Sequence, residues 1–271
     1  MYADDITISI SKNNQEELEE TSNPELSHLY TLLRENNLHL NIEKTKFISF
    51  STKQNPNKIT PNLKINTTNL KQENSMNYLG LTFEENLSWN LHIEKILNKL
   101  NSGIYALQKM KYFCSLDSLK SIYFSYIHSH ITYGIVIYGA STAENLNKIL
   151  VLQKKAIRIM LNLKEEESVK PYFRSLKILT VFSQYIYNTI LLIKSTPTLL
   201  NQHKYYTRNK IYTDYHRLEL FKKKPSYAGR KFLSRIPLQI KQEEDFKQFK
   251  SKLKNYLLSK AIYSFMEFME D

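Results

Sequence analysis

Apolar and polar positions alternate close to the start of the chain. Ile6, Ile8 and Ile10 are separated by single polar residues, so their side chains would share one face of a β-strand. A helix is expected to begin at Asn23-Pro24-Glu25, which combines a capping residue, a proline for the first helical position and an acid for the first turn. Further short strands are expected at residues 46–51, 63–66, 69–72 and 77–83.

After Trp89 the apolar positions change to a helical period. They recur at helical spacing in residues 91–107, 116–127, 146–160, 172–194 and 246–257. We therefore predict an α+β fold with a boundary near residues 84–90, in which an α/β part is followed by a mostly helical part. Three regions are expected: 1–88, 89–200 and 201–271.

Charge divides the chain in a similar way. Residues 1–100 carry 10 basic and 13 acidic side chains, whereas residues 101–271 carry 28 and 13. Residues 201–260 alone hold 16 basic and 5 acidic side chains. A basic field this concentrated suits a polyanionic partner, although a solvated, lysine-rich surface would have the same composition.

Other features of the composition limit the cellular compartments in which the protein is expected. Cys114 is the single cysteine, which leaves no internal disulfide and favours a reducing environment. No apolar run is long enough for a membrane span, and the acidic, polar start does not have the pattern of a secretory signal. An intracellular location without a membrane partner is expected, and the sequence does not distinguish nucleus from cytoplasm.

The strongest candidate for chemistry is Tyr2-Ala3-Asp4-Asp5, directly before the alternating segment. A tight turn between strands would bring both carboxylates to one point, and carboxylate oxygens are the ligands that Mg²⁺ prefers. Two adjacent acids alone are a weak signal, because such pairs are usually solvated turn residues. An aromatic and a small residue before them, and a strand after them, make the pattern more specific.

Several further segments follow in a recognisable order. Together with the Tyr-Ala-Asp-Asp motif they resemble the reverse transcriptases of non-LTR retrotransposons, and the tail resembles the C-terminal extension of jockey-like mobile elements. The resemblance covers nearly the whole chain. The segments that carry it are Leu38–Phe47, Tyr78–Leu81, Glu84–Ile93, Tyr133-Gly134, Gln153–Arg158 and parts of residues 207–254.

The resemblance implies a fold and an activity. Residues 1–88 would be the C-terminal part of a palm, residues 89–200 a helical thumb and connection, and residues 201–271 a basic extension. The activity would be RNA-directed DNA polymerisation on an RNA template and a DNA primer. In that reaction two Mg²⁺ ions activate the attacking oxygen and stabilise the leaving pyrophosphate.

It also implies roles for individual residues. Asp4 and Asp5 would bind the metal, and Lys44 would act near the pyrophosphate, unless it is an ordinary surface lysine at a strand start. A second group would form a primer-grip-like strand, in which the glycine lets the primer backbone approach closely, unless this is an ordinary strand with a turn glycine. Its members are Tyr78, Leu79 and Gly80.

One part of the family's active site is absent from this sequence. The family places its first metal-binding aspartate on a strand upstream of the hairpin, and the sequence begins at Met1. The fingers would also lie upstream. We therefore expect these 271 residues to be inactive alone, and a separate N-terminal palm and fingers segment to be the missing partner.

Two alternatives to a polymerase fragment remain open. The first is a non-catalytic nucleic-acid-binding module, because tyrosines interleave with the basic residues of 201–260 and suit base stacking beside backbone neutralisation. The second is a non-functional remnant of an inserted element. The basic side chains expected to contact nucleic acid are Arg208, Arg217, Arg230 and Lys231.

Overall fold

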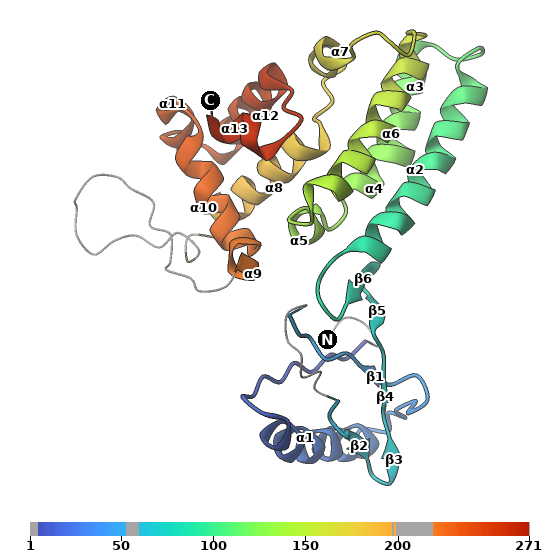
Figure 1. Cartoon of the computed structure of the whole chain (residues 1–271), viewed down its shortest axis with the longest axis vertical. Helices are drawn as coiled ribbons and strands as arrows, with labels where there is room; N and C mark the ends of the chain where they lie inside the picture. The colour runs from blue at the N-terminus through green and yellow to red at the C-terminus, as the bar shows by residue number, and fades with distance from the viewer. Residues whose placement is uncertain (1–4, 53–59, 197, 199–218, 271) are drawn as a thin grey trace. The chain divides into compact units, whose positions relative to one another are not determined.

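The computed structural model describes residues 5–52, 60–196, 198 and 219–270 of the chain (Figure 1). It divides into two compact units, 1–88 and 89–271. Among the described residues, the first unit holds one helix and short strands, and the second is helical. The fold is therefore α+β, as the apolar pattern predicted. Near residue 88 the chain changes from mixed helix and strand to helix alone.

Unit 1 is built on a single long helix, α1 (Gln15–Glu35). It begins nine residues before the predicted start, because Asn14 and not Asn23 is the cap: the Asn14 side chain accepts a hydrogen bond from the Glu17 backbone N–H at 2.8 Å. Pro24 lies inside the helix. The predicted helix start was therefore wrong.

Asn23 instead binds a distant segment of unit 1 through its side chain. Its side-chain oxygen accepts a hydrogen bond from the Lys64 backbone N–H at 2.9 Å, and its amide nitrogen donates to the Asn62 carbonyl at 3.3 Å. The side chain therefore ties α1 to a strand about forty positions further along the chain. The capping preference of Asn23 was inferred from neighbouring residues alone, and such an inference cannot predict a contact with a distant strand.

The strands of unit 1 form three separate pairs (Figure 1). The predicted strand at residues 6–10 was wrong: these residues form no strand, and Ile6 and Ile8 are 39% and 43% exposed. Without a buried face the alternation has nothing to stabilise it. The pairs are β1 (Lys46–Phe47) parallel to β4 (Lys71–Gln72), β2 (Lys64–Ile65) antiparallel to β3 (Thr68–Asn69), and β5 (Ser75–Tyr78) antiparallel to β6 (Leu81–Glu84).

Unit 2 is a helical assembly in which α2 packs along α6, and α8 packs against α10, α12 and α5 (Figure 1). Its first helices are α2 (Asn90–Met110), α3 (Leu116–Tyr123), the π-helical turn η1 (Phe124–His128), α4 (Ser129–Thr132), α5 (Ile135–Tyr138) and α6 (Ala143–Leu161). The others are α7 (Lys170–Ser175), α8 (Val181–Ser195), α9 (Glu219–Lys222), α10 (Pro225–Arg235), α11 (Leu238–Lys241), α12 (Phe246–Lys260) and α13 (Phe265–Glu270).

A buried glutamine joins the two helix groups of unit 2. Gln153 of α6 is fully buried, and its amide nitrogen donates to the Tyr123 hydroxyl at 3.0 Å and to the Leu179 carbonyl at 3.2 Å. Its oxygen accepts from the Val181 backbone N–H at 2.8 Å. The first turn of α8 is therefore fixed against α3 and α6 by one side chain.

The described part of the expected C-terminal extension belongs to the same unit. Helix α10 lies against α8 so closely that a methyl group on Gly229 would come within 2.5 Å of the Ile193 side chain and 2.9 Å of the Thr189 carbonyl oxygen. The Thr180 hydroxyl, at the start of α8, donates to the Ile262 carbonyl at 2.7 Å. Residues 219–270 are therefore packed onto the helices that precede them.

None of the helices in the described part of the chain is both long and apolar enough to cross a bilayer.

Candidate nucleic-acid interface

The acidic pair is only partly described. Asp4 lies outside the described residues, and Asp5 is exposed at a single bridge position. Within the described part of the chain, no three His, Cys, Asp or Glu side chains gather in a way that could hold a metal ion. The described residues thus offer one accessible carboxylate at this place.

Lys44 occupies a turn just before β1. The Asn41 side chain accepts a hydrogen bond from the Lys44 backbone N–H at 3.1 Å, and the Asn41 carbonyl accepts from the Thr45 hydroxyl at 2.8 Å. These two bonds stabilise the turn, so the residue types at Asn41 and Thr45 have a local structural explanation. The Lys44 side chain is exposed, so its ammonium group is accessible.

The expected strand at residues 77–83 is a hairpin, so that prediction was wrong. Tyr78 ends β5, Leu81 begins β6, and Leu79 and Gly80 form the turn with φ angles of 45° and 76°. Positive φ at both central residues is typical of the type I′ turn, which matches the twist of a two-residue hairpin. The glycine is required here by backbone conformation, independently of any ligand.

The predicted basic contacts fall into two groups. Arg208 and Arg217 lie outside the described residues. Arg230 is 3% exposed within α10, whereas the neighbouring Lys231 is exposed. A guanidinium so deeply buried has little surface to offer a phosphate, so Lys231 is the better placed of the two.

An exposed aromatic group lies at the end of α2 and was not predicted. We call Tyr105, Tyr112 and Phe113 the aromatic tip; Tyr112 and Phe113 are 78% and 85% exposed. The Lys109 ammonium lies 5.4 Å from the centre of the Tyr105 ring, and the Lys111 ammonium lies 4.9 Å from that of Tyr112. Phe113 lies outside the apolar stripe of the helix, and this was the signal available in the sequence.

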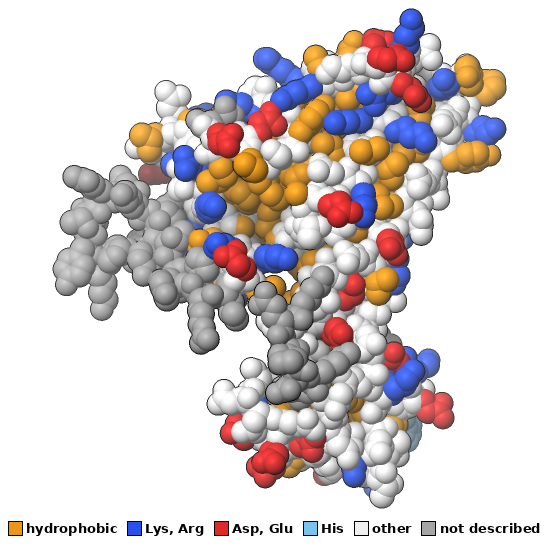
Figure 2. All heavy atoms as spheres, viewed as in Figure 1, with side chains coloured by type: hydrophobic (Ala, Val, Ile, Leu, Met, Phe, Trp, Pro, Cys, Tyr) orange, Lys and Arg blue, Asp and Glu red, His pale blue; other side chains and the backbone are white. Residues whose placement is uncertain are grey.

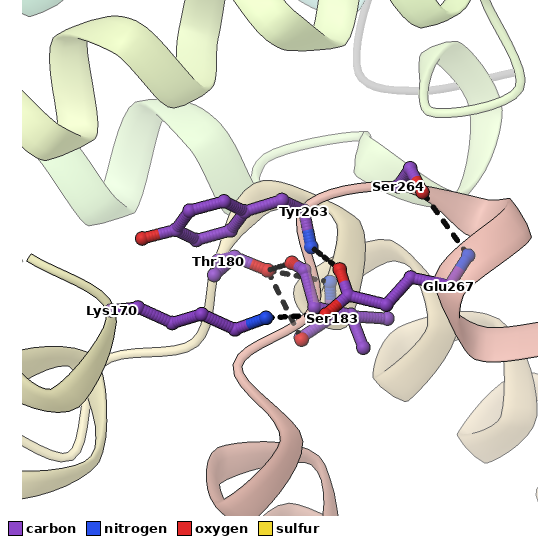
Figure 3. Close-up of polar contacts among 7 residues, drawn as sticks. Lys170, Thr180, Ser183, Tyr263, Ser264 and Glu267 are labelled. Atoms are coloured by element: carbon purple, nitrogen blue, oxygen red, sulfur yellow. Dashed lines mark hydrogen bonds and ion pairs between the residues drawn. The ribbon is translucent and has the colours of Figure 1, made fainter. Parts of the chain in front are cut away.

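A second unpredicted group joins α6, α7 and the C-terminal segment. We call Lys154, Arg158, Lys170, Tyr263 and Glu267 the Tyr263 cluster. The Lys154 ammonium lies 3.9 Å from the centre of the Tyr263 ring and that of Lys170 lies 5.3 Å from it. Figure 3 shows Lys170 extending past the Tyr263 ring to form an ion pair with Glu267.

Burial keeps two histidines of unit 2 neutral. The pKa of His92 falls to about 4 because the ring is buried and because Lys95 and Lys99 repel a second positive charge. The pKa of His128 also falls to about 4, through burial and the charge of Lys254. Near neutral pH the positive field of this unit therefore comes from lysine and arginine, which Figure 2 shows spread over the face in view with apolar side chains between them.

The chain is similar in sequence to polymerases of mobile elements. The chain is 26% identical over 125 residues to the RNA-directed DNA polymerase from mobile element jockey of Drosophila melanogaster, a match that covers 45% of this chain. It is 27% identical over 164 residues, or 58% of the chain, to the corresponding jockey polymerase of Drosophila funebris. The chain is a relative of non-LTR retrotransposon RNA-directed DNA polymerases.

The relationship to jockey polymerases extends to other elements. A "Probable RNA-directed DNA polymerase from transposon BS" of Drosophila melanogaster is 26% identical over 160 residues, which is 58% of this chain. The matched regions make up 13%, 17% and 18% of the three relatives, so the chain spans only a small part of their length. No family model and no solved structure matches the chain.

Proposed function

We propose that this chain is part of an RNA-directed DNA polymerase of a non-LTR retrotransposon. The observation that carries the proposal is the similarity to jockey polymerases, which extends over as many as 164 residues. In this proposal unit 1 is part of the palm, with the β5–β6 hairpin at the primer. Unit 2 is the thumb together with the C-terminal extension, and both contact an RNA template paired with a DNA primer.

The proposed metal chemistry needs more than the described residues supply. Two Mg²⁺ ions would promote nucleotide addition and would be held by Asp4 and Asp5 with further oxygen ligands. Asp5 is exposed and therefore accessible to a cation, but no metal-binding group of three side chains is found among the residues that the structure describes. We propose that another polymerase segment provides the remaining ligands.

Primer extension on the purified chain tests the catalytic part of this proposal. Without the other ligands, the reacting groups are not held in position, and a misplacement of about 1 Å can cost roughly 100-fold in rate. The 271 residues alone should therefore show no template-dependent synthesis with Mg²⁺ or Mn²⁺. Synthesis that is lost on Asp4→Asn and Asp5→Asn substitution would contradict the proposed inactivity and would establish these two residues as catalytic.

A specific observation favours a second candidate, a nucleic-acid-binding module without catalysis. The aromatic tip exposes three rings, two of them beside lysines, which is an arrangement that can stack bases while neutralising phosphates. Such a module would bind paired and single strands without regard to the primer end. A polymerase fragment would prefer a hybrid with a recessed 3′ end.

A non-functional remnant makes a third, different prediction. A remnant that does not fold would show no cooperative unfolding transition. A chain in which unit 2 is folded around the buried Gln153 network should show one. Circular dichroism during urea titration separates these cases.

A further inference from the structure

We propose that the Tyr263 cluster is a binding site for a backbone phosphate of nucleic acid. The proposal rests on the proposed function, since it names one surface through which unit 2 would contact its nucleic-acid partner. It is carried by the convergence of three cations, by a positive charge that is only partly balanced, and by two buried polar atoms without a hydrogen-bond partner among the described residues.

Three basic side chains from two helices meet at one tyrosine. Lys154 and Arg158 lie one turn apart on α6, and Lys170 is the first residue of α7. The ammonium groups of Lys154 and Lys170 both lie near the Tyr263 ring, at 3.9 and 5.3 Å from its centre. The Arg158 guanidinium donates to the Glu167 carbonyl at 3.2 Å, which fixes it at the same end of α6.

The positive charge of this cluster is only partly balanced. Glu267 forms an ion pair with Lys170, while Lys154 and Arg158 form no ion pair with any carboxylate in the described part of the chain. Burial, followed by repulsion from Arg158 and Lys170, lowers the pKa of Lys154. A phosphate between these side chains would relieve the repulsion and form charge-assisted hydrogen bonds.

Two buried polar atoms at the same place point to a missing ligand. The Tyr263 hydroxyl and the Nε of Arg158 are both shielded from solvent, and neither has a hydrogen-bond partner among the described residues. Buried polar groups are nearly always hydrogen-bonded in folded proteins. Burial raises the pKa of Tyr263 to about 12, so its hydroxyl keeps its proton. It can donate to a phosphate oxygen once the bound phosphate has drawn aside the side chains that cover it.

The structural role of this region does not account for those atoms. The C-terminal segment is held by the Lys170–Glu267 ion pair, by the Tyr263 backbone N–H donating to Glu267 at 2.7 Å, and by the Thr180 hydroxyl donating to Ile262 (Figure 3). None of these contacts involves the Lys154 ammonium or the Tyr263 hydroxyl. Two of the cluster's groups are therefore available beyond what anchors the segment.

Fluorescence anisotropy with a labelled RNA–DNA hybrid, over a series of salt concentrations, tests the site. The variants are Lys154→Gln and Tyr263→Phe in the full chain, with Lys148→Gln as the matched control. Lys148 lies on the same helix and forms an ion pair with Glu144 at 2.9 Å, outside the cluster. Thermal unfolding of each variant is measured in parallel.

The proposal predicts a loss of affinity without a loss of stability. Lys154→Gln should weaken binding and reduce the slope of log K against log salt by about 0.7–0.9, the value for one lost phosphate contact. Tyr263→Phe removes a hydroxyl that has no hydrogen-bond partner in the described part of the chain. The unfolding temperature of this variant should therefore match that of the wild type or exceed it, while its affinity falls. A purely structural hydroxyl would not give that combination.

Two results would overturn the proposal, and they differ in what else they remove. If the wild type binds and both variants bind like Lys148→Gln, the phosphate site is wrong while nucleic-acid binding stands. If the wild type binds no hybrid at low salt, the phosphate site and the proposed function both fail.

Discussion

At the level of single residues, Gln153 is a buried polar side chain that joins three parts of unit 2. It satisfies three polar partners from α3, from the loop before α8 and from α8 itself, with no exposed surface. Replacing it with an apolar residue would leave those groups buried without partners. The spacing of residues 146–160, with Gln153 among them, predicted helix α6 correctly, but it did not indicate which buried groups Gln153 would bind.

We predict that Gln153→Leu lowers the free energy of unfolding by about 3 kcal/mol or more, because each unsatisfied buried group costs roughly 1–3 kcal/mol. Urea unfolding followed by circular dichroism measures the change. Gln108→Leu, at an exposed position of α2, is the control and should have little effect. Equal stability of the two variants would contradict the proposed role of the network.

Gly229 gives a second prediction at the same level. Alanine normally stabilises a helix relative to glycine, by about 0.5–1 kcal/mol. At this position the added methyl group would meet the Thr189 carbonyl and the Ile193 side chain, so Gly229→Ala should destabilise the chain by about 1–3 kcal/mol. Thermal unfolding beside Ser234→Ala on the same helix measures it, and a rise in unfolding temperature would show that α10 is not packed this closely.

The buried histidines predict a pH dependence of stability. Their pKa values are about 4 in the folded state against 6.5 for an unperturbed histidine, so the unfolded chain binds more protons between these values. Stability should therefore be complete above about pH 6.5 and should fall as the pH drops towards 4. Replacing His92 and His128 with Phe should flatten unfolding temperature against pH in this window; an unchanged slope would assign the effect to other groups.

At the level of elements, the pattern of neighbouring residues predicted that a helix or strand exists more reliably than it predicted where that element begins and ends. The helices of unit 2 mostly follow the apolar stripes, because the stripes become buried faces. The single helix predicted over residues 172–194 was wrong: residues 176–180 are not helical and separate α7 from α8. The first strand and the start of α1 were wrong because both were inferred from neighbouring residues. In the structure Asn23 binds a distant strand, and Ile6 and Ile8 remain exposed.

The β5–β6 hairpin supplies the prediction that belongs to this level. Gly80 has a φ of 76°, which alanine adopts only with strain. Gly80→Ala should destabilise the hairpin by about 1 kcal/mol or more and increase amide hydrogen exchange across β5 and β6. Exchange within unit 2 provides the internal reference, and unchanged protection in the hairpin would contradict the turn assigned here.

For the chain as a whole, the sequence indicated the family and the comparisons support it, but it did not indicate the surfaces. Asp4 of the motif lies outside the described residues, and Asp5 belongs to no group of three metal-ligating side chains among those that are described. The Tyr263 cluster combines side chains that are far apart in the sequence and meet only after α13 has packed. No periodicity along the chain can predict such a meeting.

The most direct test is an anisotropy titration of the full chain with two RNA–DNA hybrids, one with a recessed 3′ end and one with blunt ends. A polymerase fragment with a basic binding surface should bind the recessed hybrid more tightly. If it makes six or more phosphate contacts, raising the salt from about 50 to 200 mM should reduce its affinity by roughly 1,000-fold or more. Equal affinity for both hybrids would favour the non-catalytic module. Absence of binding at low salt would contradict a nucleic-acid function for this chain.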